Sequence, residues 1–190
     1  MSNGGISITL FGLVRIDLPP ITAESIRRRF TDRTIFGGPC LLIDRRWGLA
    51  LDATTDPRHG TRPVLWTPHA APWQQWRIKR ARGETVRIVS EHGGMVLTTD
   101  AAPKTGDGSW VWLENDQRRD SQQWKIKPTD DRVAFLVQAN QSEYALDART
   151  DTKVPAVEPH GSVDDPTPPI LWSTHREPWQ QWLIVRLPLD

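Results

Sequence analysis

The chain has 190 residues, which is enough for one large domain or two very small ones. It carries 24 Lys and Arg against 23 Asp and Glu, and this balance gives no net field to attract a nucleic acid, a membrane surface or an acidic partner. The single cysteine excludes a disulfide framework, a cysteine-based zinc site and a CxxC redox motif, since each needs at least two. The unusual count is ten Trp, against four Phe and one Tyr.

The first residues predict neither a secretory signal nor a membrane span. No basic segment precedes the apolar run, and no small-residue cleavage site follows it. The run from Ile6 to Val14 is far shorter than the ~20 residues that cross a bilayer. The single cysteine also fits a reducing compartment, so we expect a cytoplasmic protein or one that is released without a signal peptide.

Residues 1–37 are predicted to form an extension outside the main domain. Apolar residues alternate with polar ones from Ile6 to Leu18, which predicts a strand that is interrupted at Gly12. Thr22 is a candidate cap for a short helix that runs to Phe30. Because an exposed strand edge is a liability, we expect this extension to pack on the main domain or to mediate self-association into a homo-oligomer.

Three copies of a QQWxI motif divide the remaining chain into repeats. The copies read PWQQWRI, DSQQWKI and PWQQWLI, at spacings of 48 and 58 residues. ALDATTD and PVLWT precede the first copy, as ALDARTD and PILWS precede the third. The third repeat carries about eleven additional residues, which fall in a Pro-, Gly- and Asp-rich stretch typical of a surface loop. The predicted domain is 38–187, with repeats 38–80, 81–128 and 129–187.

The repeats are predicted to be all-β. Each opens with two short β-prone runs around a polar or glycine-containing turn, which is a hairpin signal. The closing motif has period two, which places Gln74, Trp76 and Ile78 on one face of a strand. We expect the Trp and Ile of each copy to lie in the core. The Gln amide should form hydrogen bonds with backbone groups of a neighbouring loop. Three such units favour a closed threefold barrel over a propeller, which needs at least four blades.

Three QxW motifs in register, each preceded by an LD or equivalent and by an LW element, resemble the ricin-B-type (R-type) lectin domain. The resemblance covers about residues 38–186 and implies a β-trefoil, with six strands in a barrel and six in a cap. In that family each repeat can offer one shallow sugar site. An Asp after the second strand accepts hydrogen bonds from sugar hydroxyls, and an aromatic residue of the LW element stacks on the sugar ring.

Transferred to this chain, the resemblance implies two sugar sites. In repeat one, Asp52 is the acceptor and Trp66 the platform, while His69, Trp73 and Gln74 line the rest. In repeat three the same roles fall to Asp147, Trp172, His175, Trp179 and Gln180.

Repeat two departs from this pattern. Thr98 stands at the position of the Asp and offers no charged acceptor, so we expect this site to be inactive. The platform position is Glu114 on the best alignment, or Trp112 if the gap is shifted. Many galactose-binding members of the family have Asn directly before the QxW Gln, and the resemblance therefore does not imply galactose for a chain with Trp73, Ser121 and Trp179 there.

A plainer interpretation of these residues stays open. Asp52 and Asp147 lie in polar stretches, where Asp is a frequent turn residue. Trp66 and Trp172 are candidates for the core. On the same interpretation His69 and His175 are solvent-facing loop residues, and Trp73 and Trp179 form a packed rim.

The sequence therefore predicts a lectin that binds glycans or glycoconjugates and is not an enzyme. It contains no HExxH, GxSxG or phosphate-binding loop, and its five His form no close pair, so neither a metal nor a cofactor is expected. The alternative is a β-trefoil protein-interaction module, such as a protease inhibitor or an adaptor, that uses loop 154–168. A third possibility is a targeting module for an enzyme on another polypeptide.

Overall fold

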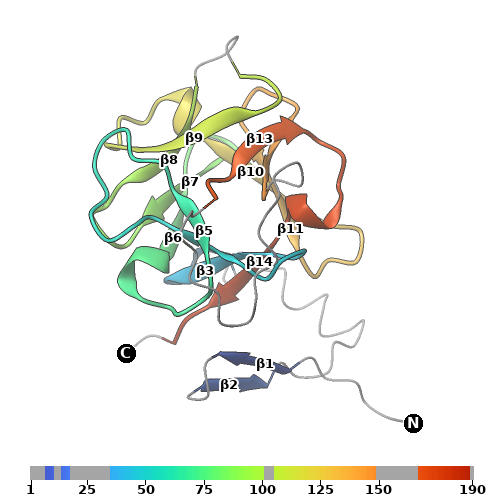
Figure 1. Cartoon of the computed structure of the whole chain (residues 1–190). Coiled ribbons are helices and arrows are strands. Elements are labelled where there is room, and N and C mark those ends of the chain that lie inside the picture. The colour runs from blue at the N-terminus through green and yellow to red at the C-terminus, as the bar shows by residue number, and fades with distance from the viewer. Residues whose placement is uncertain (1–6, 11–13, 18–34, 101–104, 149–166, 189–190) are drawn as a thin grey trace. The chain divides into compact units, whose positions relative to one another are not determined.

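The first 37 residues contain a hairpin. The structure is a computed structural model that describes residues 7–10, 14–17, 35–100, 105–148 and 167–188, and its chain divides after Gly37 into two units (Figure 1). In the first unit β1 (Ser7–Leu10) pairs antiparallel with β2 (Val14–Asp17). The expected single strand interrupted at Gly12 is therefore two paired strands, because a period-two pattern looks the same whether it runs straight or returns through a turn. The predicted helix from Thr22 to Phe30 lies outside the described residues.

The second unit contains a sheet of twelve strands among its described residues. Three short 3-10 turns precede the last strand of each repeat: η1 (Pro72–Gln74), η2 (Asp120–Gln122) and η3 (Pro178–Gln180). Repeat one contributes β3 (Cys40–Asp44), β4 (Ala50–Asp52), β5 (Val64–Trp66) and β6 (Trp76–Arg80). Repeat two contributes β7 (Val86–Ser90), β8 (Val96–Thr99), β9 (Ser109–Glu114) and β10 (Trp124–Pro128). Repeat three contributes β11 (Phe135–Ala139), β12 (Tyr144–Asp147), β13 (Ile170–Ser173) and β14 (Gln181–Arg186).

The first and last strands of the repeats close into a ring. β6 pairs with β7, β10 with β11 and β14 with β3, which joins the end of the third repeat to the start of the first. Within the repeats, β3 pairs with β6, β7 with β10 and β11 with β14. The second and third strands form the hairpins β4–β5, β8–β9 and β12–β13. This is the β-trefoil that the three motifs predicted, with six strands in the barrel and six in the cap (Figure 1).

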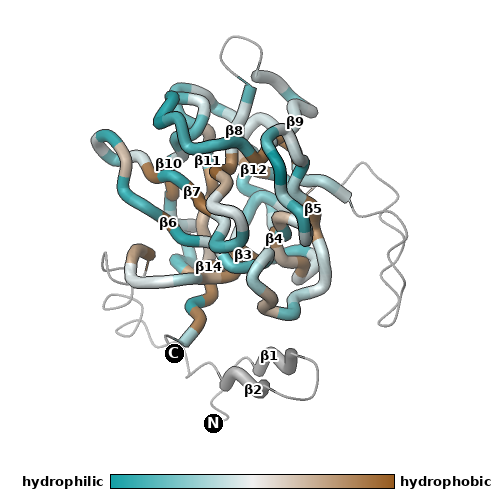
Figure 2. Tube along the Cα trace, turned by 90° about the vertical axis from the view of Figure 1, so that its left-hand side faces the viewer, coloured by the Kyte–Doolittle hydropathy of each residue, from teal (hydrophilic) through white to brown (hydrophobic). Residues whose placement is uncertain are grey.

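The QxW tryptophans form the centre of the core, as expected. Trp76, Trp124 and Trp182 are fully buried. Each indole Nε1 donates a hydrogen bond to a carbonyl of the second strand of its own repeat, over 2.8 Å to Leu51, 2.8 Å to Leu97 and 3.0 Å to Leu146. Each Trp therefore fills the barrel and ties the barrel to the cap hairpin of its own repeat. Figure 2 shows hydrophobic residues concentrated along inner strands, including β11 and β12.

Two details of the closing motif differ from the expected strand face. The Gln of QxW lies in the 3-10 turn, and extended backbone begins only at the next residue. Of the three isoleucines that follow, Ile78 is buried, whereas Ile126 and Ile184 are only partly buried. A period-two count cannot detect one tight turn at the start of a strand, and it therefore assigned the Gln to the wrong element.

Two tryptophans of repeat two enclose an arginine on the cap. Trp110 and Trp112 are two residues apart on β9 and so point to one face. The guanidinium carbon of Arg62, from repeat one, lies 4.1 Å from the ring centroid of Trp110 and 4.7 Å from that of Trp112. These cation–π contacts join the cap of repeat one to that of repeat two.

Candidate functional site

The register of the cap hairpins brings the candidate Asp and the candidate platform together. In β4–β5, Asp52 is paired with Val64 and Ala50 with Trp66. Asp52 and Trp66 are therefore diagonal neighbours on one face of the hairpin. Repeat three has the same register, with Asp147 opposite Ile170 and Ala145 opposite Trp172.

An open hollow of about 370 Å³ lies over this face in repeat one. Asp52 forms part of its wall although the residue is only 4% exposed, and Trp66 is partly exposed beside it. The side chains that line the hollow are Asp52, Thr54, Thr55, Val64, Trp66, His69 and Trp73. Four of the five residues predicted for this site thus meet in one place, and Gln74 is the exception.

The two carboxylate oxygens of Asp52 have different surroundings. Oδ1 accepts a hydrogen bond of 2.7 Å from the N–H of Thr54, whose φ of 67° is in the left-handed region. Oδ2 lies 3.6 Å from Nε2 of His69. Burial raises the pKa of the Asp52 carboxyl, while the Thr54 N–H, the Gln74 amide and the charge of His69 act in the opposite direction. One oxygen therefore serves the turn, as the plainer interpretation expected, and the other is on the side of His69.

His69 is held between the carboxylate and two other rings. Its Nδ1 accepts a hydrogen bond of 3.2 Å from the N–H of Ala71, which leaves Nε2 as the nitrogen that carries a proton toward Asp52. Its ring packs edge-on against Trp73, with centroids 5.7 Å apart. Trp73 in turn packs edge-on against His92, at 6.0 Å. Both candidate side chains are therefore oriented by contacts and are not free loop residues.

His92 is a member of this ring cluster that the sequence did not predict. It lies in the turn between β7 and β8, in repeat two, and its Nε2 is 2.9 Å from the backbone oxygen of Thr55. The alignment of repeats compares positions within a repeat, so it cannot show that the hairpin of one repeat contacts residues that line the hollow of the previous one. The only signal was the presence of an aromatic heterocycle at the tip of that hairpin.

Repeat three reproduces the carboxylate–imidazole–indole arrangement. Nε2 of His175 lies 3.3 Å from Oδ2 of Asp147 and 3.3 Å from Nε1 of Trp179. Nδ1 of His175 accepts a hydrogen bond of 3.2 Å from the N–H of Glu177, which matches the bond of Ala71 in repeat one. Asp147 is 3% exposed, whereas Trp172 is 37% exposed. Residues 149–166, which follow Asp147 in the chain, lie outside the described residues.

The QxW glutamines hold the loops that carry the histidines. Oε1 of Gln74 accepts hydrogen bonds from the N–H groups of His69 and Ala70, at 2.8 and 3.2 Å, and its Nε2 donates to the oxygen of Thr67 at 3.0 Å. Gln122 and Gln180 make corresponding bonds in their own repeats. All three glutamines are fully buried. The expected role toward the loop backbone is confirmed, and Gln74 lies beneath the loop and not in the lining of the hollow.

The register also decides which residue replaces the platform in repeat two. Val96 pairs with Glu114 and Thr98 with Trp112, so Glu114 is at the position of Trp66 and Trp112 is at that of Val64. Glu114 forms an ion pair with Arg119. A hollow of about 360 Å³ exists there, lined by Thr98, Thr99, Asp100, Trp112, Glu114, Arg119 and Ser121. It has neither the buried Asp at the end of the second strand nor the Trp at the platform position.

The described part of the chain offers neither a metal site nor a membrane-spanning helix. Within it, no group of three or more His, Cys, Asp or Glu side chains is placed to hold a metal ion. No helix among the described segments has the length and apolarity needed to cross a membrane.

The sequence matches the family model of ricin-type beta-trefoil lectin domain-like proteins over residues 37–109 and 72–157. These overlapping matches together cover well over half of the chain. The chain therefore belongs to the ricin-type β-trefoil lectin domain-like family. No curated protein matches the sequence significantly.

Solved structures with the same fold include natural lectins, a designed protein and one module of an enzyme. The designed threefold-symmetric protein ThreeFoil is 28% identical, with a TM-score of 0.66, and the match covers 79% of this chain and 99% of that one. The ricin B-like lectin of Macrolepiota procera, in complex with lactose, is 22% identical, with a TM-score of 0.61 and coverage of 80% and 97%. An exo-β-1,3-galactanase from Clostridium thermocellum is 20% identical, with a TM-score of 0.65, but this match covers 79% of our chain and only 30% of the enzyme.

Proposed function

We propose that this protein is a carbohydrate-binding lectin with two shallow sugar sites, in repeats one and three, and no catalytic activity. One observation carries the proposal: a nearly buried Asp and an exposed or partly exposed Trp lie on the same face of the cap hairpin in both repeats, beside a His and a second Trp. Membership of the lectin domain-like family supports it. The Macrolepiota procera lectin, a structural neighbour, holds lactose in its complex.

The chemistry of each side chain suits a sugar. A carboxylate such as that of Asp52 is a strong acceptor for neighbouring hydroxyls. The indole of Trp66 offers a flat apolar face for the C–H face of a pyranose at little cost in side-chain entropy. His69 lies beside the carboxylate and orients it, while Trp73 widens the apolar wall. Asp147, Trp172, His175 and Trp179 take these roles in repeat three, and Gln74 and Gln180 position the loops.

The absence of catalytic activity is part of the proposal. The sequence has none of the hydrolase motifs considered above. The galactanase resembles this chain over only 30% of its own length, so the resemblance reaches a single module of that enzyme. A shallow site binds weakly by itself, and two sites on one rigid barrel gain affinity on a surface that presents several copies of a glycan.

Glycan-array binding of the wild-type chain and of the Asp52→Ala/Asp147→Ala variant tests this proposal. We expect wild-type binding to at least one glycan and its loss in the double variant, with the thermal transition and the near-UV circular dichroism of the fold retained. Thr98→Ala is the matched control, because Thr98 occupies the register position of Asp52 in repeat two, and it should bind as the wild type does.

Two results would overturn the proposal. Binding of the same glycan by the double variant would show that the site is elsewhere. An array without any bound glycan would instead favour a protein-interaction module that uses loop 154–168, most of which lies outside the described residues.

A further inference from the structure

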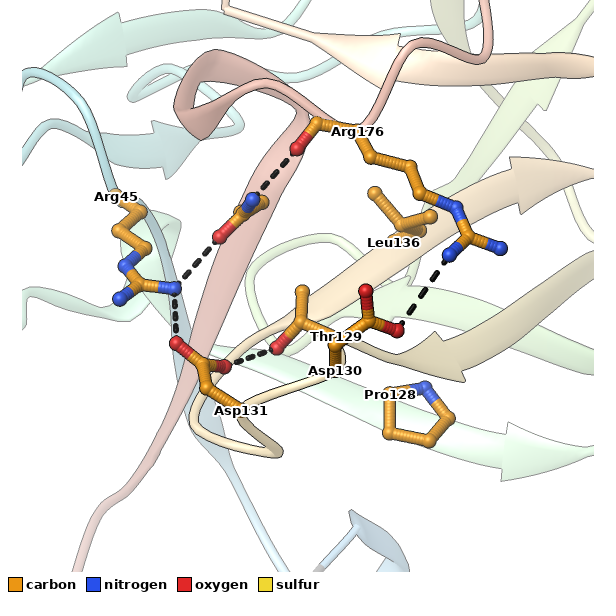
Figure 3. A pocket seen from close by; sticks show the side chains of 8 residues that line it. Arg45, Pro128, Thr129, Asp130, Asp131, Leu136 and Arg176 are labelled. Carbon is orange, nitrogen blue, oxygen red and sulfur yellow. Dashed lines mark hydrogen bonds and ion pairs between the residues drawn. The ribbon is translucent and has the colours of Figure 1, made fainter.

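A third hollow lies away from the cap hairpins, where the three repeats meet. It encloses about 220 Å³ between the turn that joins β3 to β4, the turn that joins β10 to β11, and the start of β14 (Figure 3). None of the residues that line it belongs to the two proposed sugar sites. The lining residues are Arg45, Pro128, Thr129, Asp130, Asp131, Leu136, Arg176 and Gln181.

One side of this hollow is a fixed polar network. Nη1 of Arg45 donates to Oδ2 of Asp131 at 2.6 Å and to Oε1 of Gln181 at 2.7 Å. The amide of Gln181 donates to the backbone oxygen of Arg176 at 2.6 Å. Oδ1 of Asp131 accepts hydrogen bonds from the hydroxyl of Thr129 at 2.6 Å and the N–H of Val133 at 3.0 Å. These bonds join repeats one and three and fix the positions of the donors and acceptors.

The opposite side is loosely paired. The Arg176 guanidinium is 3.5 Å from a carboxylate oxygen of Asp130, and these side chains are 68% and 93% exposed. Figure 3 shows this pair across from Arg45 and Asp131, with Leu136 between the two sides. An exposed pair at this distance contributes little, so its donors and acceptor are available to a ligand at small cost.

The two other repeats lack this arrangement. Gln75 corresponds to Gln181 and also donates to the oxygen of a left-handed residue, but that residue is Ala70 in place of Arg176. The hairpin residue that corresponds to Arg45 is Glu91 in repeat two and Asn140 in repeat three, since each donates its backbone N–H to the second Gln of a QQW motif. Repeat two keeps an arginine, Arg118, at the position of Arg176, so the departure from the threefold pattern is Arg45 and its pair with Asp131.

The chemistry of the hollow narrows the class of ligand. The two carboxylates repel an anionic ligand, and the two guanidiniums repel a cationic one. An apolar ligand would remove water from all four charged groups without replacing the hydrogen bonds that they lose. A zwitterion would pair with the largely exposed charges of Arg176 and Asp130, and such exposed pairs contribute little to binding. Neutral hydroxyl groups both donate and accept, so they can bond Arg176 and Asp130 while the Arg45–Asp131 pair stays intact.

We propose that this hollow is a third ligand site, which takes one neutral polyhydroxylated ring such as a single sugar residue. Leu136 and Pro128 supply the apolar surface for the C–H face of the ring, and Arg176 and Asp130 bind neighbouring hydroxyls. The volume is below the roughly 300 Å³ at which sites for drug-sized ligands begin, which suits one ring and not an oligosaccharide or a peptide. This inference does not depend on the two cap hollows, because it rests on different residues.

Amide NMR titration of the full chain tests the site. The probes are the methyl glycosides of mannose, glucose, galactose and N-acetylglucosamine, and the reporters are the backbone amides of Asp131 and Leu136 and the side-chain amide of Gln181. We expect saturable shifts with at least one glycoside. Arg176→Ala should weaken this binding about tenfold, the loss of one hydrogen bond to a charged group.

The variants are chosen so that the fold is kept. Arg176→Ala installs the residue that repeat one has at this position, Ala70, with φ of 56° against 61° for Arg176. Arg118→Ala is the matched control, since Arg118 occupies the same loop position in repeat two, with φ of 55°, and does not line this hollow. The Asp52→Ala/Asp147→Ala variant should retain the shifts, which separates this site from the proposed sugar sites.

Four results would overturn the inference. They are the absence of saturable shifts with every glycoside, equal effects of Arg176→Ala and Arg118→Ala, loss of the shifts in the Asp52→Ala/Asp147→Ala variant, and a response of the same amides to acetate or glycine but not to the glycosides.

Discussion

Asp52 is used twice, and its two oxygens allow the uses to be separated. Oδ1 caps the turn at Thr54, and Oδ2 lies near His69 on the wall of the hollow. A residue that serves only the turn needs one acceptor and no charge. A sugar acceptor needs the second oxygen as well, because neighbouring hydroxyls each donate a hydrogen bond.

Asp52→Asn and Asp52→Ala should therefore differ in stability but not in binding. Asn can keep the acceptor for Thr54, so we expect it to change the free energy of unfolding by less than ~0.5 kcal/mol. Ala removes the acceptor and should cost about 1 kcal/mol. Both should abolish glycan binding at repeat one. Denaturant unfolding and a glycan-binding assay in the Asp147→Ala background measure the two effects, and full binding by the Asn variant would leave Asp52 as a turn residue alone.

Cys40 should be chemically inert in the folded protein. It is fully buried, its S–H donates to the oxygen of Trp76 at 3.2 Å, and burial raises the pKa of the thiol to about 12. Since the thiolate is the reactive form, Cys40 should not react with a thiol reagent at neutral pH until the barrel opens. A colorimetric thiol assay with and without denaturant checks this, and rapid labelling of the native chain would contradict it.

At the scale of single elements, the turn after β3 depends on one buried carboxylate. Asp44 is fully buried and accepts hydrogen bonds from the N–H groups of Arg46, Trp47 and Leu49, at 3.0, 2.7 and 2.8 Å. These donors lower the pKa of Asp44, but desolvation outweighs them and raises it to about 6.

This shift predicts a pH dependence of stability. Because the pKa is higher in the folded chain than in the unfolded one, folding favours the protonated form of Asp44. Its contribution to stability is complete below about pH 4 and is lost as the pH rises through about 6, by at most ~3 kcal/mol. We expect carboxyl NMR to show Asp44 titrating near pH 6, and Asp44→Asn to lack this part of the slope. A midpoint near pH 4 would contradict the prediction.

The role of the QxW glutamine in holding its loop can be tested by comparing two repeats. Gln74→Ala and Gln122→Ala each leave buried loop N–H and C=O groups without a partner, so each should cost about 1–3 kcal/mol. Only Gln74→Ala should also weaken glycan binding, because its loop carries His69. Unfolding curves and glycan binding of both variants measure this. Equal binding losses would mean that the glutamines act through the fold as a whole.

The sequence predicts these elements unequally well. The threefold barrel follows from the motifs because Trp76, Trp124 and Trp182 must be buried in equivalent ways. The meeting of Asp52 and Trp66 follows from the resemblance, and the register supplies its geometry. The 3-10 turn at Gln74 is a local backbone choice that apolar periodicity does not reveal. His92 and Arg62 act across repeat boundaries, which an alignment of repeats does not represent.

At the scale of the whole molecule, residues 1–37 are the part that lies outside the three repeats. They form a unit of their own that contains the β1–β2 hairpin, and the pairing of the two strands satisfies one edge of each. Among the described residues no third strand pairs with the other two edges, and packing on the trefoil or self-association through residues 1–37 stays our prediction.

Deletion of residues 1–36 tests that prediction. We expect the shortened chain to keep the fold of the trefoil and to differ from the full chain in oligomeric state or solubility. Light scattering coupled to size exclusion, at matched concentrations of the two chains, measures the difference. Identical mass and solubility would show that the extension has neither role.

The closure of the barrel has a consequence for how the protein is made. β14 pairs with β3 along five residue pairs, from Trp182 opposite Asp44 to Arg186 opposite Cys40. These partners in β14 are separated from β3 by nearly the whole trefoil, and a ribosome must translate all of that trefoil before the pairs can form. Until then the nascent chain exposes the edge of its first barrel strand. Folding of the trefoil should therefore be a late event of synthesis, and the interval before it is when the chain is most exposed to aggregation and to chaperones.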